Sequence, residues 1–154
     1  MGKQKQEYEI QIVNRKAKFQ YFFEASYEAG IQLSGTEIKS IRNGEANLND
    51  AYCIFDKGEL YVKSLFIAEY KFGNQHNHET RRTRKLLLKK NELAKLERKT
   101  KEKGFTLVPY MLYINERGLA KLEFALARGK KGYDKRDSIK ERDQKRDLDR
   151  SLKY

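Results

Sequence analysis

Two basic segments contain the residue types that could do chemistry in this chain. Residues 81–103 hold 11 lysines and arginines against three acidic residues, and residues 129–154 hold ten against six. Together they account for the whole net charge of +12 at pH 7. Arginine guanidinium groups match phosphate oxygens, and clustered cations release counterions when they bind a polyanion. The segments therefore predict two surfaces for polyanions, nucleic acid before an anionic membrane surface, with a merely basic soluble protein as the alternative.

The sharpest local feature is RRTRKLLLKK at residues 81–90. Three consecutive leucines cannot all face one core from a strand, so we expect one of them to be exposed among the cations. There it could contact an unstacked base, although a buried strand flanked by solvated charges is the alternative. Aromatic residues interleaved with lysine at 61–63 and 70–72 could likewise form stacking platforms, with packing in the core as the alternative.

The residues that could carry catalysis are few. A metal site needs several His, Cys or carboxylate ligands at suitable spacing, and the two histidines, His76 and His78, have no cysteine pair to complete them. The glycines match neither nucleotide-binding fingerprint, and no serine has a partner histidine in a known order. We expect no catalytic residue, no metal and no cofactor, with a nuclease using either histidine as general base as the remaining alternative. The single cysteine, Cys53, is expected in the core.

Length and composition limit the class of protein. A chain of 154 residues forms one domain, and its 10 Tyr and 8 Phe supply bulk for a core although 36% of the residues are charged. No run of about 18 apolar residues is present, and no hydrophobic signal region follows the basic start at residues 1–5. The sequence therefore predicts a soluble, cytoplasmic protein that does not associate with a membrane.

The first third of the chain predicts two strands and one short helix. Alternating apolar residues indicate strands at 19–23 and 27–33, with a break between them. The Ser-x-x-Glu spacing of Ser34 and Glu37 is a capping box, and it predicts a helix that stops at residues 43–44. This helix is expected to present basic residues off its apolar side.

The middle of the chain predicts a hairpin, a loop and a longer helix. Strands are expected at 51–55 and 59–65 around a tight turn, and residues 66–80 have no clear period and are expected to form a loop. A helix should begin at Asn91, a plausible cap, and end at Gly104.

The last elements complete the expected fold. Residues 105–114 indicate a strand with an edge or a bulge at Pro109, and the final strand at 120–126 places every second residue from Ala120 inward. Six strands, mostly linked by hairpins, predict a mainly β fold: a small six-stranded antiparallel OB-like barrel with helices at the connections. A sandwich of a sheet and helices is the alternative.

Three regions are expected along the chain. Residues 1–16 are polar and predicted to be a flexible N-terminal segment, and residues 17–128 form the barrel. From residue 129 the apolar pattern stops, and residues 129–154 form a basic tail. Its apolar residues are too sparse to dock on the barrel, so we expect it to be disordered when free and helical against an anionic partner.

Five blocks of sequence carry a resemblance to a known family. They are NRKA at 14–17, YEAGI at 27–31, GTEIKSIR at 35–42, RTRKLLL at 82–88 and GKKGYDKR at 129–136. Taken together and in this order, they resemble the SmpB family, the bacterial tmRNA-binding or SsrA-binding proteins. The resemblance runs from about residue 14 to the end of the chain.

The resemblance implies an OB-like barrel that binds the tRNA-like domain of tmRNA. It implies a role in trans-translation, in which the protein, a monomer, brings alanyl-tmRNA with elongation factor Tu to ribosomes stalled on broken messages. The basic tail would probe the small-subunit decoding centre and the vacant mRNA channel. A general ribosome-associated RNA-binding barrel without preference for tmRNA is the alternative.

The resemblance also implies which residues bind. Glu28, Leu87 and Lys121 match RNA-contacting positions of the family, although Glu28 could instead orient a neighbouring arginine. On charge alone we expect further RNA contacts from Lys39, Arg42, Arg82, Arg84 and Lys85. The residues that match the family's decoding-centre segment are Lys130, Lys131, Tyr133, Asp134, Lys135 and Arg136.

Overall fold

The computed structural model describes residues 10–73, 77–102 and 104–130. In chain order its elements are β1 (Gln11–Val13), α1 (Ala17–Gln20), β2 (Tyr21–Ile31), α2 (Gly35–Arg42), β3 (Ala46–Asn47), β4 (Tyr52–Asp56), β5 (Glu59–Lys63), β6 (Phe66–Ile67), β7 (Arg84–Leu87), α3 (Lys90–Thr100), β8 (Phe105–Ile114) and β9 (Ala120–Gly129). Among the helices of these ranges, none is long and apolar enough to cross a membrane.

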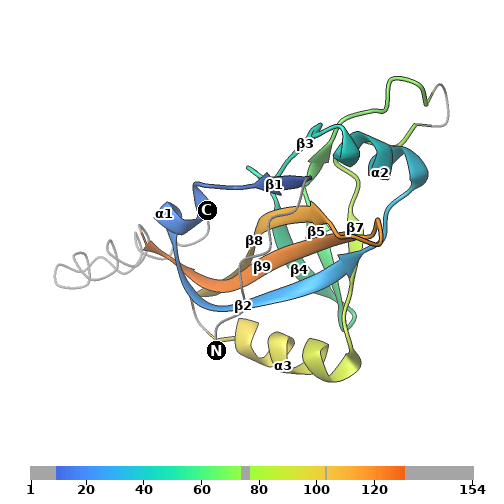
Figure 1. The fold of residues 1–154 in the computed structure, drawn as a ribbon. Coiled ribbons are helices and arrows are strands. Elements are labelled where there is room, and N and C mark those ends of the chain that lie inside the picture. The colour runs from blue at the N-terminus through green and yellow to red at the C-terminus, as the bar shows by residue number, and fades with distance from the viewer. Residues whose placement is uncertain (1–9, 74–76, 103, 131–154) are drawn as a thin grey trace.

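The strands close into a barrel. Within the described ranges one sheet has seven strands in the order β1-β8-β4-β5-β7-β2-β9, and β9 also pairs with β8. This last pairing joins the two ends of a six-stranded ring, and β1 adds to the edge of β8 that also pairs with β4. Every pairing is antiparallel. The expected six-stranded antiparallel OB-like barrel is confirmed (Figure 1).

Strand β2 corrects the expectation of two strands at 19–23 and 27–33. It is continuous from Tyr21 to Ile31, and a β-bulge between Phe23 and Ala25 shifts its register against β9. The odd positions stay the less exposed ones along the whole strand, but the small and polar residues Glu24–Ser26 at the bulge interrupt the run of large apolar residues, so one long strand looked like two in the sequence. Of the edge or bulge expected at Pro109, the structure shows a bulge, because the register of β8 against β9 shifts between Pro109 and Met111.

Four short strands were not among the six expected, and one of them, β3, pairs with β6. Because β2 is one strand where two were expected, β7 is needed as the sixth strand of the ring. β6 lies in the stretch expected to be only a loop. β1 pairs with residues 111–113 of β8, so the expected flexible segment 1–16 is wrong at residues 11–13. These strands have two to four residues each, too few for a periodic pattern to show.

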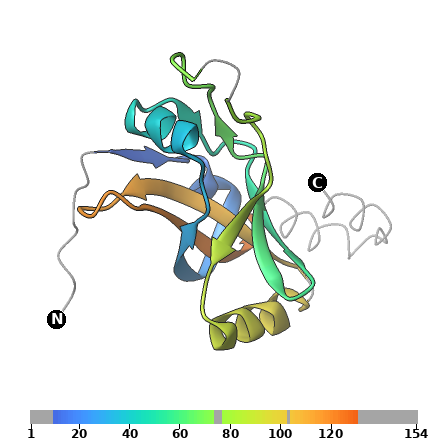
Figure 2. The ribbon, with the colours of Figure 1, turned by 90° about the vertical axis from the view of Figure 1, so that its right-hand side faces the viewer.

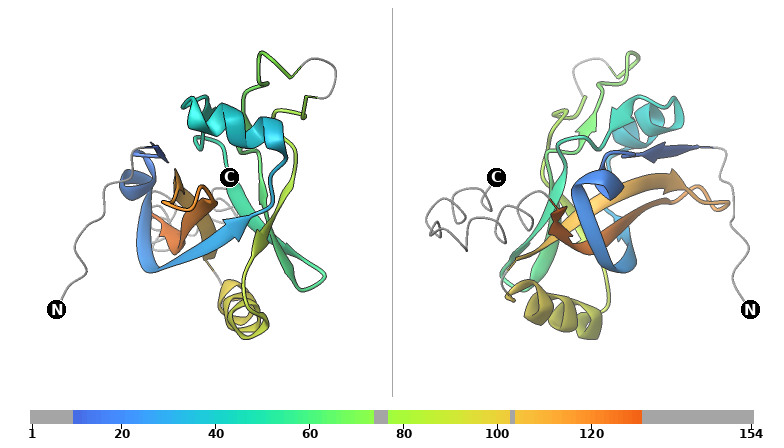
Figure 3. Two further views of the ribbon diagram at one scale, coloured as in Figure 1. Left: turned by 45° about the vertical axis from the view of Figure 1, so that its right-hand side comes forward. Right: turned by 90° about the vertical axis from the view of Figure 1, so that its left-hand side faces the viewer.

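The two longer helices lie at opposite ends of the barrel (Figures 1 and 2). The capping box of α2 is confirmed, with the Glu37 amide donating to the Ser34 hydroxyl and the Ser34 amide to the Glu37 carboxylate. α3 begins one residue before the expected cap, because the Lys89 amide donates to the Glu92 carboxylate at 3.1 Å. Views from both sides place α1 against the barrel wall, away from α2 (Figure 3).

The core fills the barrel. The expected inward residues of β9 are buried, from Ala120 through Leu122 and Phe124 to Leu126. On the outer face of the same strand, Ala125 and Ala127 form a second, smaller cluster with Ala17 of α1. Thus α1 covers one half of the outer face of β9, and the half nearer Lys121 carries polar residues.

Candidate nucleic-acid interface

A groove of about 510 Å³ opens between α2, the ends of β2 and β7, and the turn between β8 and β9. Its lining combines three cations with an apolar surface: Gly30, Ile31, Leu33, Gly35, Ile38, Lys39, Arg42, Leu87, Gly118, Leu119, Ala120 and Lys121. Four residues expected to bind RNA therefore meet here, although they come from three distant parts of the chain. They are Lys39, Arg42, Leu87 and Lys121.

Strand register explains this meeting. Gly30 of β2 pairs with Leu87 of β7 on one side and with Lys121 of β9 on the other. The Leu87 side chain packs against Gly30, because a Cβ built at Gly30 would lie 3.5 Å from it. Residues opposite one another on adjacent strands share a face, so Leu87 and Lys121 point the same way.

Leu87 is the exposed leucine that the sequence predicted. Its side chain is 48% exposed, whereas Leu86 is fully buried in the core and Leu88 is half-buried. Leu119, which was not expected at the site, provides a second apolar side chain in the groove and is 54% exposed. It lies in a turn held by the Asn115 side chain, whose oxygen accepts from the amide of Leu119 at 2.9 Å. A single leucine directly after Gly118 was the one feature of the sequence that could have indicated it.

Glu28 lies beside the groove, two positions before Gly30 on the same outer face of β2. It is paired across the strands with Glu123, and the two carboxylates repel each other unless each accepts a hydrogen bond from a donor nearby. Two tyrosines of β8 supply those donors: Tyr113 donates to Glu28, and Tyr110 donates to Glu123 at 3.0 Å. Tyr113 thus takes the place of the arginine considered from the sequence. Burial, aided by the charge of Glu123, raises the pKa of Tyr110, which keeps its hydroxyl a donor.

The structure contradicts the prediction that Arg84 binds RNA. It was expected to contact RNA, but its side chain is fully buried at the end of the barrel under α2. Its Nε donates to Glu37 at 2.5 Å and its Nη1 to the carbonyl of Leu65 at 2.7 Å. A buried guanidinium is stable only when it is paired and hydrogen-bonded, and this environment provides both. Arg84 therefore positions α2 and cannot reach RNA.

Arg82 completes what we call the Glu37–arginine cluster: Glu37, Arg82 and Arg84. The Arg82 guanidinium donates to both carboxylate oxygens of Glu37, at 2.7 and 3.3 Å. Burial alone would raise the pKa of Glu37, but hydrogen bonds from Arg82, the Ser34 amide and Arg84 outweigh it and lower the pKa. The cluster holds Glu37 ionised and thereby fixes the helix that presents Lys39 and Arg42 to the groove.

Lys85 lies on the outward face of β7, on the same side as Leu87, and faces Glu59 at 3.6 Å. An RNA contact from Lys85 or from the half-exposed Arg82 stays a prediction, as does direct contact from the groove residues and Glu28.

His78 has a structural role. One ring nitrogen is hydrogen-bonded to the hydroxyl of Thr36 in α2 and the other to the carbonyl of Ile67 in β6, each at 2.9 Å. It therefore ties the segment after β6 to the helix. His76 lies outside the described residues.

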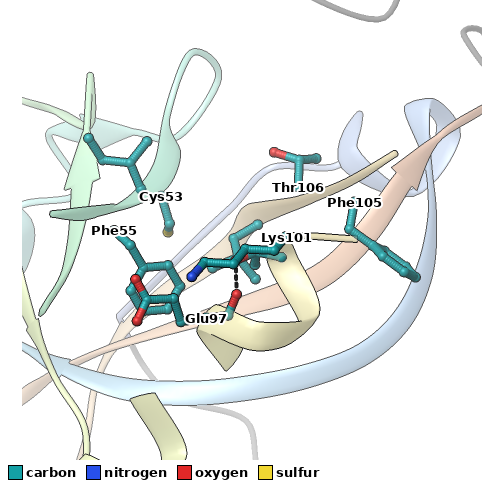
Figure 4. A pocket seen from close by; sticks show the side chains of 9 residues that line it. Cys53, Phe55, Glu97, Lys101, Phe105 and Thr106 are labelled. Carbon is teal, nitrogen blue, oxygen red and sulfur yellow. Dashed lines mark hydrogen bonds between the residues drawn. The ribbon is translucent and has the colours of Figure 1, made fainter. Parts of the chain in front are cut away.

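A second pocket, of about 250 Å³, lies between α3 and strands β4 and β8 (Figure 4). Its charged lining residues, Glu97 and Lys101, have opposite signs, whereas those of the groove are all basic. Cys53 lines its inner wall and is buried, as expected, and burial raises the pKa of its thiol. The groove is therefore the stronger candidate for a polyanion.

Of the expected tail contacts, only Lys130 lies in the described residues. Its ammonium donates to the carbonyl of Lys18 at 2.9 Å and lies 5.0 Å from the ring centre of Phe22. It follows the end of β9, whereas Lys121 lies near the start of that strand. At about 3.3 Å a residue, the eight positions from 121 to 129 span roughly 26 Å. Lys131, Tyr133, Asp134, Lys135 and Arg136 are outside the described part of the chain.

A closed antiparallel barrel with a basic groove and exposed leucines defines a small β-barrel protein of the nucleic-acid-binding type. The family model described as SmpB protein matches residues 11–154. The chain belongs to the SmpB family.

Individual relatives agree with this assignment. The chain is 59% identical over 144 residues to an SsrA-binding protein of Phocaeicola vulgatus, a match that covers 94% of this chain and 96% of that protein. It is 58% identical to an SsrA-binding protein of Parabacteroides distasonis, covering 94% of each chain. A chain of a solved structure described as "tmRNA-SmpB: a journey to the center of the bacterial ribosome" is 48% identical, with a TM-score of 0.68. That match covers 79% of this chain and 85% of the solved chain.

Proposed function

We propose that this protein binds the tRNA-like domain of tmRNA through the groove and acts in trans-translation. It brings alanyl-tmRNA, with elongation factor Tu, to ribosomes stalled on broken messages. The observation that carries the proposal is the meeting of Lys39, Arg42, Leu87 and Lys121 around one groove in a chain of the SmpB family. The names of the relatives support the choice of RNA.

The groove suits RNA for physical reasons. Its three cations supply affinity for phosphates, which is sensitive to salt and independent of sequence. The exposed side chains of Leu87 and Leu119 provide apolar contacts for an unstacked base or a ribose. Glu28 can accept hydrogen bonds from base amines and 2′-hydroxyls, groups that phosphate-binding lysines do not distinguish. Discrimination therefore comes from Glu28, the leucines and the shape of the groove.

The tail has a separate role in this proposal. The part of the tail beyond Lys130 enters the vacant mRNA channel and lays its cations along ribosomal RNA near the decoding centre. A channel filled by intact mRNA would exclude them, so a stalled ribosome is selected by vacancy. The position of Lys130 supports this division, because the tail begins at the far end of the β2–β9 pair from the groove.

We further propose that the protein works in the cytoplasm as a monomer, without catalysis and without a cofactor. Support comes from the charge pattern, from the structural role of His78 and from the opposite charges of Glu97 and Lys101 in the second pocket.

Competition binding tests the proposal. The labelled tRNA-like domain of tmRNA is bound to the protein and displaced by unlabelled total tRNA at two salt concentrations. We expect a strong preference for the tRNA-like domain that survives the higher salt, because contacts to specific groups depend less on salt than contacts to phosphates do. Equal affinities, both collapsing at the higher salt, would instead show a general RNA-binding barrel.

Leu87→Asp should weaken binding of the tRNA-like domain by more than ~1 kcal/mol, because it removes an apolar contact and adds a negative charge beside the phosphates. The barrel should keep its melting temperature, because the Leu87 side chain is half exposed. Phe19→Asp on α1 is the matched control, with the same change of charge at an exposed apolar residue far from the groove. A collapsed circular-dichroism melt of the Leu87 variant would show that Leu87 belongs to the core.

A further inference from the structure

Two aromatic side chains project from residues 68–73, which we call the aromatic loop. Phe72 is 68% exposed. Tyr70 packs against it edge to face, with ring centres 5.5 Å apart and planes at 71°. The alternative of core packing therefore fails for Phe72.

Cations lie over both rings. The ammonium of Lys39 is 5.4 Å from the ring centre of Tyr70, and that of Lys71 is 5.5 Å from that of Phe72. Lys39 also lines the groove, so the aromatic loop and the groove form one continuous basic surface. Aromatic faces beside cations are the arrangement that binds unpaired nucleotides, with a base on the ring and its phosphates on the cations.

The aromatic loop is held in place by hydrogen bonds. The Asn77 side chain accepts from the amide of Tyr70 at 2.9 Å and donates to its carbonyl at 2.6 Å. Gly73 packs so closely that a Cβ there would lie 2.6 Å from the Asn77 amide and 3.0 Å from Thr36 of α2. His78 bonds to the same Thr36. The rings are thus presented by a preorganised segment, which lowers the entropy cost of binding.

We infer that Phe72 stacks on an unpaired base of the RNA that occupies the groove. Tyr70 supports the ring from its edge, and Lys39 and Lys71 contact the neighbouring phosphates. Charge favours this partner over an apolar protein surface, which would have to desolvate both ammonium groups. The inference rests on the proposed function, because it takes the same RNA and extends its contact beyond the groove.

Substitutions at Phe72 test the stacking. Phe72→Ala should weaken binding of the tRNA-like domain roughly 5- to 100-fold, the range for losing one stacked base. Phe72→Leu should weaken it nearly as much, whereas Phe72→Trp should retain or improve it, because stacking needs a planar ring. Phe19→Ala on α1, an aromatic side chain that is 80% exposed, should leave the affinity unchanged.

Fluorescence reports the contact directly. The chain contains no tryptophan, so Phe72→Trp places a single indole in the aromatic loop. Its emission should be quenched when the tRNA-like domain binds, and the emission of a Phe19→Trp variant should not change. An abasic nucleotide at the stacked position of the RNA should remove the quenching and weaken binding to the parent protein but not to Phe72→Ala.

The outcomes separate the two proposals. If Leu87→Asp loses affinity while Phe72→Ala binds as tightly as the parent, the groove binds RNA and the stacking inference is wrong. If neither variant changes the affinity, the proposed function of the groove fails as well. Equal affinities of the Phe72→Leu and parent proteins would show an apolar contact and overturn stacking.

Discussion

Replacing Glu37 with glutamine should lower the free energy of unfolding by about 3–5 kcal/mol, the cost of removing one partner of a buried ion pair. The side chains of Glu37 and Arg84 are both 0% exposed, and the carboxylate accepts from Arg84, Arg82 and the Ser34 amide. A neutral amide leaves the Arg84 charge uncompensated in the barrel and places an NH₂ against a guanidinium. Urea unfolding followed by circular dichroism measures the change.

Two further variants identify the cause. Glu116→Gln makes the same substitution at an exposed glutamate in the β8–β9 turn and should change stability by less than about 0.5 kcal/mol. Glu37→Gln combined with Arg84→Met should cost less than the sum of the single changes, because both remove the same pair. Additive costs would show that the two side chains act independently and that the buried pair is not the source of stability.

Lowering the pH should reveal how much the same Glu37–Arg84 pair contributes to stability. The pKa of Glu37 in the folded protein lies below its ordinary value of 4.5, so its contribution is present above that pH. The contribution is lost as the pH falls through the lowered pKa and the carboxyl takes up a proton. Unfolding midpoints measured from pH 6 downward should therefore fall less steeply below about pH 4.5 in Glu37→Gln than in the parent. Parallel curves would contradict this assignment.

Removing residues 131–154 should leave affinity for the tRNA-like domain within about threefold of the parent and abolish tagging of stalled chains. The barrel keeps Lys130, which bonds to Lys18 and lies over Phe22. The tail begins roughly 26 Å from Lys121, about three Debye lengths at physiological salt, so the charge of Lys130 at its start is screened from the groove. Tagging is measured in a purified translation system with alanyl-tmRNA and a message without a stop codon.

A full-length variant separates the role of the tail from its mere presence. Alanine at Asp134, Lys135 and Arg136 keeps the chain length and should lose tagging while RNA affinity is retained. If the truncated protein instead loses most of its affinity for the tRNA-like domain, the tail belongs to the RNA site and the proposed division of roles is wrong.

Much of the fold follows from local sequence. The helix α2 and its capping box, the β4–β5 hairpin and the bulge at Pro109 depend on residues a few positions apart, so their patterns could be recognised. The elements that the sequence did not predict depend instead on residues far away in the chain. β1, β3, β6 and β7 have two to four residues, and only partners elsewhere in the chain make them strands. In β2 the small and polar residues Glu24–Ser26 at the bulge broke a run of large apolar residues that would otherwise have indicated one strand.

The same division holds for the site. Sequence alone determined the excess of basic residues, the capping pair Ser34 and Glu37, and the need to expose one of three leucines. Only the tertiary structure decided that Leu87 and Lys121 meet across Gly30, and that Arg84 turns inward to a glutamate 47 positions away. The residue type sets the sign of a charge, whereas the fold decides which group lies close enough to pair with it and whether the pair is buried. The run RRTRK therefore predicted a basic surface correctly but could not indicate that one of its arginines lies inside the barrel.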